Sequence, residues 1–431
     1  MTEKSDKMKI NSNMLTKVYI WLIIIISSSF FGFYNVLPKV IDAYFTDAIA
    51  LLLILISLFF SLIYFIADKF RFSKNSIIDL FAWSFGIYVI VEVLISHFKY
   101  SSSQDFTMTI KEAIVFIAPI IVYLQLRKNI NNKECLDYLI SVMIKVSLIC
   151  SIVAIMAFLL YQNAGLNILK QDVNGASFIR NNRGHFMVGS MVVLPATILL
   201  WSRIITSKRN IVNVIILLVN LFHIIYIGQT RMIIFITLLT MLISFVFSIK
   251  KSRTFKLLII IPLLICFILL EIQDIYSNFE TLMGDNSVTY RLSGIDYYVK
   301  QLGDYPIFGM GFISTKNVEL SHLLYGPDHI FYRTDVGFIG FINCFGILGG
   351  IWYIAILLYF IKLLMKKKPV NSLIYSYCFS IVLFIIFSSI NLFPLDGFRI
   401  IYFPIIALLM NNLGKIEEEQ FFSEEVLYGK E

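Results

Sequence analysis

Long uninterrupted apolar stretches constrain this chain more than any other feature. A membrane-crossing helix needs about 20 mostly apolar residues, because the hydrocarbon core of a bilayer is about 30 Å thick. Twelve stretches of this 431-residue chain meet that requirement. We expect spans at residues 18–37, 47–67, 77–95, 108–126, 139–161, 185–202, 211–228, 230–249, 256–273, 341–364, 372–391 and 398–413.

The composition agrees with an integral membrane protein. Hydrophobic residues make up 58% of the chain and charged residues 15%, whereas soluble domains are roughly half apolar and a quarter charged. We therefore predict an all-α, polytopic membrane protein with about 12 transmembrane helices in a single domain, residues 1–431. The apolar run after the basic N-terminal segment lacks a small-residue cleavage site, so we expect a retained first helix.

The distribution of lysine predicts the orientation. The N-terminal tail and the loops after the second, fourth, sixth, eighth and tenth spans carry most of the lysines. By the positive-inside rule this side is cytoplasmic, which places both termini inside. These loops account for the formal net charge of +8, so we expect no nucleic-acid partner. One large extracytoplasmic loop, residues 273–332, then lies between the ninth and tenth spans.

Arginine is concentrated on the opposite face, where topology does not require it. A planar guanidinium binds phosphate groups through two parallel hydrogen bonds and stays charged at any relevant pH. This distribution predicts an anionic ligand on the outer face. The six outer arginines are Arg180, Arg183, Arg231, Arg291, Arg333 and Arg399.

Ionisable residues inside spans are costly and are therefore candidates for function. Those at outer span ends predict a hydrated, charged pocket that opens outward, although each alone could be an interfacial anchor. Asp79, near an inner end, is explained by a side chain that reaches the interface. We find no internal repeat and no matched helix breaks, which argues against a transporter. The outer set is Glu92, Lys111, Glu112, His223, Arg231 and Glu271.

Two of the outer arginines stand in helical contexts. Arg231 follows the short turn Gly228–Thr230 and opens a helix, where the dipole disfavours a cation unless an anion is near. Residues 286–302 carry an apolar stripe at spacings of three and four, and Pro306 follows. We expect an amphipathic helix on the membrane surface with Arg291 at the edge of its apolar face. The stripe is Val288, Leu292, Ile295, Val299 and Leu302.

The segment before the tenth span holds the best candidate for acid–base chemistry. His329 can take up a proton near neutral pH, and Asp328 or Asp335 could orient it, with Arg333 beside them. The spacing of Gly309 and Gly311 fits a turn at least as well as a phosphate-binding loop.

An earlier outer loop offers a second contact region. Arg180 and Arg183 could touch a phosphate or a sugar there, or form part of a solvated loop. No cluster with metal-ligand spacing stands in an outer loop, so we expect no metal and no cofactor.

Taken together, Gln229–Arg231, the Tyr290–Leu292 and Pro306–Gly311 segments and Asp328–Gly340 resemble the O-antigen polymerase and ligase superfamily. The resemblance covers the whole topology, with motifs only in residues 228–350. It implies a glycosyltransferase that uses an undecaprenyl-diphosphate-linked oligosaccharide at the outer face of the cytoplasmic membrane.

The resemblance also implies roles for individual residues. Arg231 and Arg291 would bind the lipid diphosphate, and His329 would activate the acceptor hydroxyl. From their positions in the outer loops, and apart from the resemblance, we expect Arg180, Arg183, Arg333, Asp328 and Asp335 to contact substrate. Asp335 departs from the glutamate more usual at its position, which leaves its role open.

Several readings remain open at this point. A polymerase of lipid-linked repeat units is our first choice, with a chain-length regulator protein as a candidate partner. An O-antigen ligase, which transfers glycan to a lipid A core, shares the fold and the chemistry. A flippase for lipid-linked oligosaccharides is the rival from a different class. A mannosyltransferase-like enzyme is weaker, since its usual acidic pair would fall on Asp42 and Asp47 alone.

Overall fold

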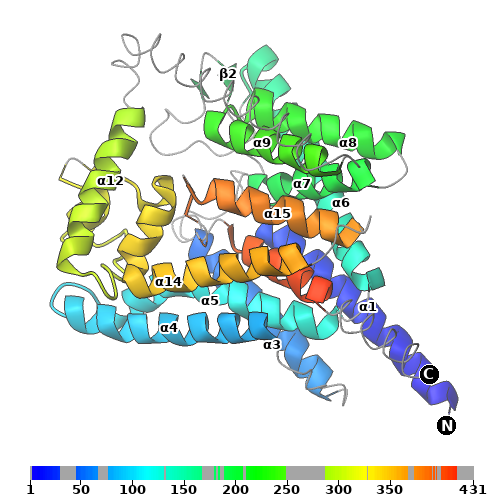
Figure 1. Cartoon of the computed structure of the whole chain (residues 1–431), viewed down its shortest axis with the longest axis horizontal. Coiled ribbons are helices and arrows are strands. Elements are labelled where there is room, and N and C mark those ends of the chain that lie inside the picture. Colours follow the sequence, from blue (N-terminus) through cyan, green and yellow to red (C-terminus); the bar gives the residue numbers. More distant parts are fainter. Residues whose placement is uncertain are drawn as a thin grey trace.

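A computed structural model shows a bundle of packed apolar helices (Figure 1). Among the residues that the structure describes, the regular elements are helices apart from one two-stranded pair. The structure describes residues 2–29, 45–66, 76–130, 133–166, 179–180, 183–184, 189–206, 210–248, 287–327, 329–366, 373–390, 392–393, 395 and 399–414.

The helices correspond closely to the apolar stretches of the sequence. Five of them are long and apolar enough to cross a membrane, and six shorter apolar helices accompany them within the described residues. The membrane-embedded, helical character of the chain is therefore confirmed, while the count of twelve spans and the sidedness stay predictions. The long helices are α4 (Ile77–Tyr100), α5 (Phe106–Asn129), α6 (Lys133–Ala164), α9 (Arg231–Ser248) and α14 (Gly337–Lys366).

The remaining elements complete the bundle. The expected ninth span, 256–273, lies outside the described residues, as does Glu271. The expected tenth span begins at Gly337, four residues earlier than the sequence indicated, behind a short 3-10 turn. The remaining described helices, besides the five long ones, are α1 (Thr2–Ser27), α3 (Phe45–Ile66), α7 (Ser190–Thr206), α8 (Ile211–Phe222), the π-helix η2 (His223–Ile227), α12 (Ser287–Asp304), α13 (Ser321–Tyr325), η3 (Arg333–Asp335), α15 (Leu373–Ser388) and a helix at Tyr402–Gly414.

The bundle has two distinct ends. Phe338 N donates to Ser389 O at 2.7 Å, so α14 begins where α15 finishes. At the other end Arg203 Nε of α7 donates to Tyr377 Oη of α15 at 2.9 Å. Phe247 of α9 packs against Phe379 there, with ring centroids 4.9 Å apart. The starts of α9 and α14 therefore share one end, which we call the site end.

Helix α12 lies crosswise over the site end, next to α14 (Figure 1). The expected amphipathic helix is thus confirmed within two residues of its predicted bounds. The face that packs on the protein is not the apolar stripe, however. Tyr298 is fully buried and Gln301 is 9% exposed, whereas Leu292 and Val299 are 63% and 47% exposed. Tyr298 and Gln301 make hydrogen bonds inside the bundle, whereas Leu292 and Val299 of the stripe face outward and Ile295 and Leu302 are half-buried.

An aromatic core joins the helices beneath the site. Phe85 of α4 stacks on Trp352 of α14, with ring centroids 4.2 Å apart. Phe312 packs against both Phe116 of α5 and Phe345 of α14, each at 5.6 Å. Such aromatic contacts add roughly 0.5–1.5 kcal/mol each beyond the area they bury. The loop after α12 is therefore anchored in the core by Phe312.

A buried ion pair fixes α4 to α5 at the opposite end. Asp79 forms a salt bridge with Arg127, and both side chains are buried. Tyr123 Oη donates to Asp79 Oδ1 at 2.9 Å, and Ser76 N donates to Asp79 Oδ2 at 2.6 Å as part of a capping box. The expectation that Asp79 reaches out to the interface was wrong, because its carboxylate is 1% exposed and bonded inside the protein.

Removing one partner of this pair should destabilise the protein. Asp79→Ala leaves the Arg127 guanidinium buried without its counter-charge, which typically costs about 3–5 kcal/mol. We expect a large drop in the apparent melting temperature of the detergent-purified protein. The control is Asp296→Ala, which removes an exposed pair with Lys300 and should change little. Equal effects of the two substitutions would contradict the structural role of Asp79.

Candidate functional site

Residues 305–314, which we call the strap, form the frame of the candidate site. Helix α12 ends at Asp304, and Pro306, which lacks an N–H, follows. Residues 309–314 are then non-helical and every one of them is buried. Buried non-helical backbone inside a membrane protein must find its hydrogen-bond partners within the protein.

The strap finds its partners at a break in α14. Gly346 has φ 62° and ψ −171°, which interrupts the helix. Met310 N donates to Asn343 O at 2.7 Å and Gly311 N to Cys344 O at 3.0 Å. Tyr88 Oη of α4 donates to Phe345 O. The carbonyls freed by the break are thus satisfied by the strap and by α4.

Two glycines allow this close approach of backbones. A Cβ on Gly309 would lie 2.5 Å from Gly346 N, and a Cβ on Gly346 would lie 2.1 Å from Ile307 O. Both residues also have positive φ, which other residues adopt only at a cost. The Gly309–Gly311 spacing therefore serves a backbone crossing in this structure.

The other side of the strap is held by polar groups of α4 and the turn after it. Phe312 N donates to Ser96 Oγ at 2.9 Å, and Tyr100 Oη donates to Met310 O at 2.8 Å. Gln104 accepts from Ser314 N at 2.8 Å and donates to Phe312 O at 3.0 Å. These four contacts fix the strap against the site end of α4.

Arg333 is the charged centre of the site. It lies in η3 and is partly exposed. Its Nη1 donates to Gly311 O at 3.1 Å, while Nε and Nη2 are buried without a hydrogen-bond partner. Leaving such donors unsatisfied costs roughly 1–3 kcal/mol each, and more for a charged group. An acceptor with two oxygens would remove that cost.

Two further charges lie within electrostatic range of Arg333, on α4. Glu92 is 1% exposed, and Lys99 Nζ lies 3.0 Å from the Tyr305 ring centroid. Lys99 and Arg333 both interact electrostatically with the Glu92 carboxylate. The site therefore combines one carboxylate with two cations around Gly311.

His329 lies on the exposed loop that leads into η3. Its φ is 54°, and its N–H donates to Gly326 O at 3.2 Å. The imidazole lies beside Tyr325, with ring centroids 6.2 Å apart. Within the described residues no hydrogen bond joins it to Asp335, which is exposed, and Asp328 lies outside them. The expected orientation of His329 by Asp335 is thus not present in this structure.

Tyrosines surround the arginine and the histidine. Tyr298 Oη donates to Leu324 O at 2.6 Å, and Tyr297 Oη donates to His322 O at 2.7 Å. Burial raises the pKa of Tyr298 and of Tyr325 above the ordinary value, and the positive charge of Arg333 opposes that shift in both. These phenols stay protonated at neutral pH and serve as hydrogen-bond donors.

Arg291 shares the inner face of α12. It is partly buried and stands three and seven residues before Gly294 and Tyr298, the residues that face α14 and the loop. Gly294 lies against Phe331 and Val336. Arg291 is therefore placed one helical turn from the loop that carries His329.

Arg231 belongs to a separate group at the same end. It is exposed at the start of α9, which packs on α7, α15 and η2. Arg180 and Arg183 pair across β1 (Ile179–Arg180) and β2 (Arg183–Gly184), and β2 packs on α6. Among the described residues, none of the more extensive packing contacts joins α9 or β2 to α12 or η3.

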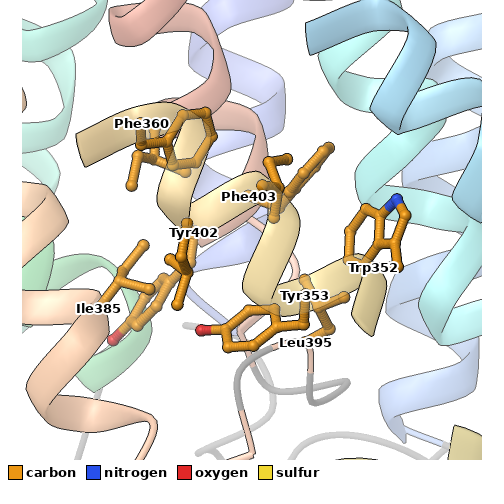
Figure 2. Close-up of a pocket in the computed structure, with 10 residues that line it drawn as sticks. Trp352, Tyr353, Phe360, Ile385, Leu395, Tyr402 and Phe403 are labelled. Atoms are coloured by element: carbon orange, nitrogen blue, oxygen red, sulfur yellow. The ribbon is translucent and has the colours of Figure 1, made fainter. Parts of the chain in front are cut away.

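A small aromatic pocket lies away from the charged site, between α14, α15 and the Tyr402–Gly414 helix. Figure 2 shows the rings of Trp352, Phe360 and Phe403 around it. Tyr353 Oη lies 2.5 Å from Ser389 Oγ, and Tyr402 Oη is buried without a partner. The pocket has room for about one water molecule, so it is a packing defect and not a substrate site.

The sequence pointed to part of this site. It indicated Arg333, Arg291 and His329 as outer candidates and Glu92 as a costly intramembrane charge. It missed Lys99, Ser96, Tyr100 and Gln104, which hold the strap. Among the described residues, no three His, Cys, Asp or Glu side chains gather as metal ligands do. Comparison with models of known protein families and with characterised proteins finds no match.

The glycine crossing can be tested directly. Gly346→Ala forces a side chain into a left-handed conformation and against Ile307 O, which together should cost roughly 2–5 kcal/mol. We expect loss of a monodisperse peak in size-exclusion chromatography or a large drop in melting temperature. Gly303→Ala is the matched control, because a Cβ there meets nothing within 4 Å. Similar behaviour of both variants would contradict the crossing.

Proposed function

We propose that this protein is a membrane glycosyltransferase that polymerises lipid-linked oligosaccharide repeat units. The donor is a growing glycan on undecaprenyl diphosphate, and the acceptor is a sugar hydroxyl on the next lipid-linked repeat. The site end faces the outside of the cytoplasmic membrane in this proposal. The observation that carries it is the Arg333 guanidinium, anchored at one nitrogen and unpartnered at two others.

Arginine chemistry supports a diphosphate as the group that is bound. The unpartnered Nε and Nη2 of Arg333 form one edge of the guanidinium fork, which matches two oxygens of a phosphate. Arg291 on the inner face of α12 adds a second cation near the same loop. Arg231, Arg180 and Arg183 lie at the same end of the bundle and would add to the field that attracts an anion.

The proposed reaction is a direct displacement at the sugar carbon. His329 accepts the proton of the acceptor hydroxyl while the oxygen of that hydroxyl bonds to the anomeric carbon. The bond from that carbon to the diphosphate oxygen breaks, and the electron pair leaves with the diphosphate. Arg333 and Arg291 stabilise the charge that appears there. Attack opposite the leaving group inverts the configuration of the sugar carbon.

The polymerase is distinguished from its rivals by the glycan of a deletion strain. Loss of a polymerase leaves glycans of single repeats on the outer leaflet. Loss of a ligase leaves full-length polymer on the polyprenyl carrier, and loss of a flippase traps single repeats on the cytoplasmic leaflet. Polymer of normal length in the deletion strain would remove the proposed function.

Complementation of that strain tests the two central residues. Removing a general base typically costs 10²–10⁴-fold in rate, so about that loss is expected for His329→Ala. Arg333→Ala should lose roughly 10²–10³-fold, because a preorganised donor to the leaving group is gone. His322→Ala is the matched control, an exposed histidine in the same region whose imidazole lies against Glu319 O through Nδ1. Polymer levels are compared at equal protein abundance, and normal polymer from His329→Ala would contradict its role.

A further inference from the structure

The carboxylate of Glu92 is buried with one oxygen unpartnered. Its Oε1 accepts a hydrogen bond from Ser96 Oγ at 3.4 Å, whereas Oε2 is buried and has no partner. A buried carboxylate is costly while it is ionised, and an opposite charge lowers that cost. An ionised Glu92 at this position therefore requires a cation nearby.

Arg333 is the cation that fits this requirement. Lys99 and Arg333 both lie within electrostatic range of Glu92. Lys99 has other partners, because its Nζ donates to Gly309 O at 3.3 Å and makes a cation–π contact with the Tyr305 ring. Arg333 retains two buried donors without a partner. Its unmet donors match the unmet acceptor of Glu92.

Both groups touch the same residue of the strap. Arg333 Nη1 donates to Gly311 O at 3.1 Å, and a Cβ on Gly311 would lie 2.7 Å from Glu92 Oε1. A side chain at Gly311 would therefore collide with Glu92 Oε1 and Ser96 Oγ, and the glycine lets both charged groups lie against the same residue of the strap.

The two groups differ in their access from outside. Glu92 is 1% exposed, whereas Arg333 is partly exposed in η3. An external anion can therefore reach the exposed side of Arg333 but not Glu92, and it contacts Nε and Nη2, which are buried in this structure, when the guanidinium turns outward. A guanidinium edge accommodates one carboxylate or one phosphate at a time, so the anion and Glu92 compete for Nε and Nη2.

We propose that Glu92 is the internal counter-ion and positioning residue of Arg333, displaced from it when a phosphate-bearing anion binds. The inference rests on the proposed function, in which that anion is a lipid diphosphate; an anionic phospholipid headgroup offers the same chemistry. Glu92 compensates Arg333 in the unliganded protein. In the liganded protein the phosphate does so, and Glu92 keeps its hydrogen bond from Ser96.

The test is binding of inorganic pyrophosphate to the full-length protein in phosphatidylcholine nanodiscs, measured by calorimetry. Glu92→Gln keeps the shape and removes the competing charge, so the dissociation constant should fall about threefold or more. Arg333→Gln should weaken binding roughly tenfold or more, also in the Glu92→Gln background. The control is Asp296→Asn on α12, which removes an exposed carboxylate that pairs with Lys300 and should leave the affinity unchanged.

A merely structural role for Glu92 would not tighten binding. Unchanged or weaker affinity in Glu92→Gln overturns the inference. A lack of pyrophosphate binding by both the wild-type protein and Glu92→Gln overturns it as well. If Glu92→Gln does not fold, Glu92→Asp draws the charge back from Arg333 and should tighten binding by a smaller factor. Unchanged or weaker affinity in that variant is equally decisive against the inference.

Two further readouts distinguish a diphosphate from a phospholipid headgroup as the bound anion, and the counter-ion inference from the proposed glycosyltransferase. Nanodiscs with phosphatidylglycerol weaken pyrophosphate binding through Arg333 if a lipid headgroup is the occupant, and do not if the site takes a diphosphate. Tightening in Glu92→Gln with normal polymer in the deletion strain would remove the glycosyltransferase and keep the counter-ion. Loss of polymer in the deletion strain together with unchanged affinity in Glu92→Gln would keep the glycosyltransferase and remove the counter-ion.

Discussion

The backbone crossing between the strap and α14 is the constraint on which the site end depends. A helix that breaks in a membrane frees carbonyl groups, and each one left unsatisfied in lipid costs several kcal/mol. Here the amides of Met310 and Gly311 and the hydroxyl of Tyr88 satisfy those carbonyls. The break at Gly346 and the buried strap therefore require each other. The same crossing brings Gly311 against Glu92 and Arg333, so the charged site exists because the backbone problem is solved there.

The polar groups that hold the strap occupy one face of α4. Glu92, Ser96, Lys99 and Tyr100 follow one another at spacings of four, three and one, so they line the side of the helix that meets the strap. Three of them bond strap backbone, and the fourth touches Gly311. In a medium of low dielectric, charges fixed in this way act more strongly than mobile charges in water. The same face of α4 therefore both holds the strap in place and carries the charges of the site.

Much of the fold could be predicted from the sequence, because apolar runs of span length have few alternatives. Helix α12 was also predictable, from the three- and four-residue spacing of its apolar side chains and from Pro306. The burial of the strap was not, since its hydrogen bonds to α4 and the following turn join residues more than 200 positions apart. For the same reason the sequence misjudged Asp79, whose partners depend on how α4 and α5 pack. It also misjudged the packed face of α12, because an apolar stripe does not reveal that Tyr298 and Gln301 have hydrogen-bond partners inside the bundle.

The two groups of arginines at the site end differ in what they can contribute to binding an anion. Arg333 is held by Gly311 O and packed beside Cys344, so little conformational entropy remains to be lost when a ligand binds. Arg231 is exposed at the start of α9, and a mobile exposed cation acts mainly through long-range attraction that salt screens. An anchored guanidinium with unmet donors is the stronger binding group. The geometry therefore ranks Arg333 before Arg231, the reverse of the order that the family resemblance implies.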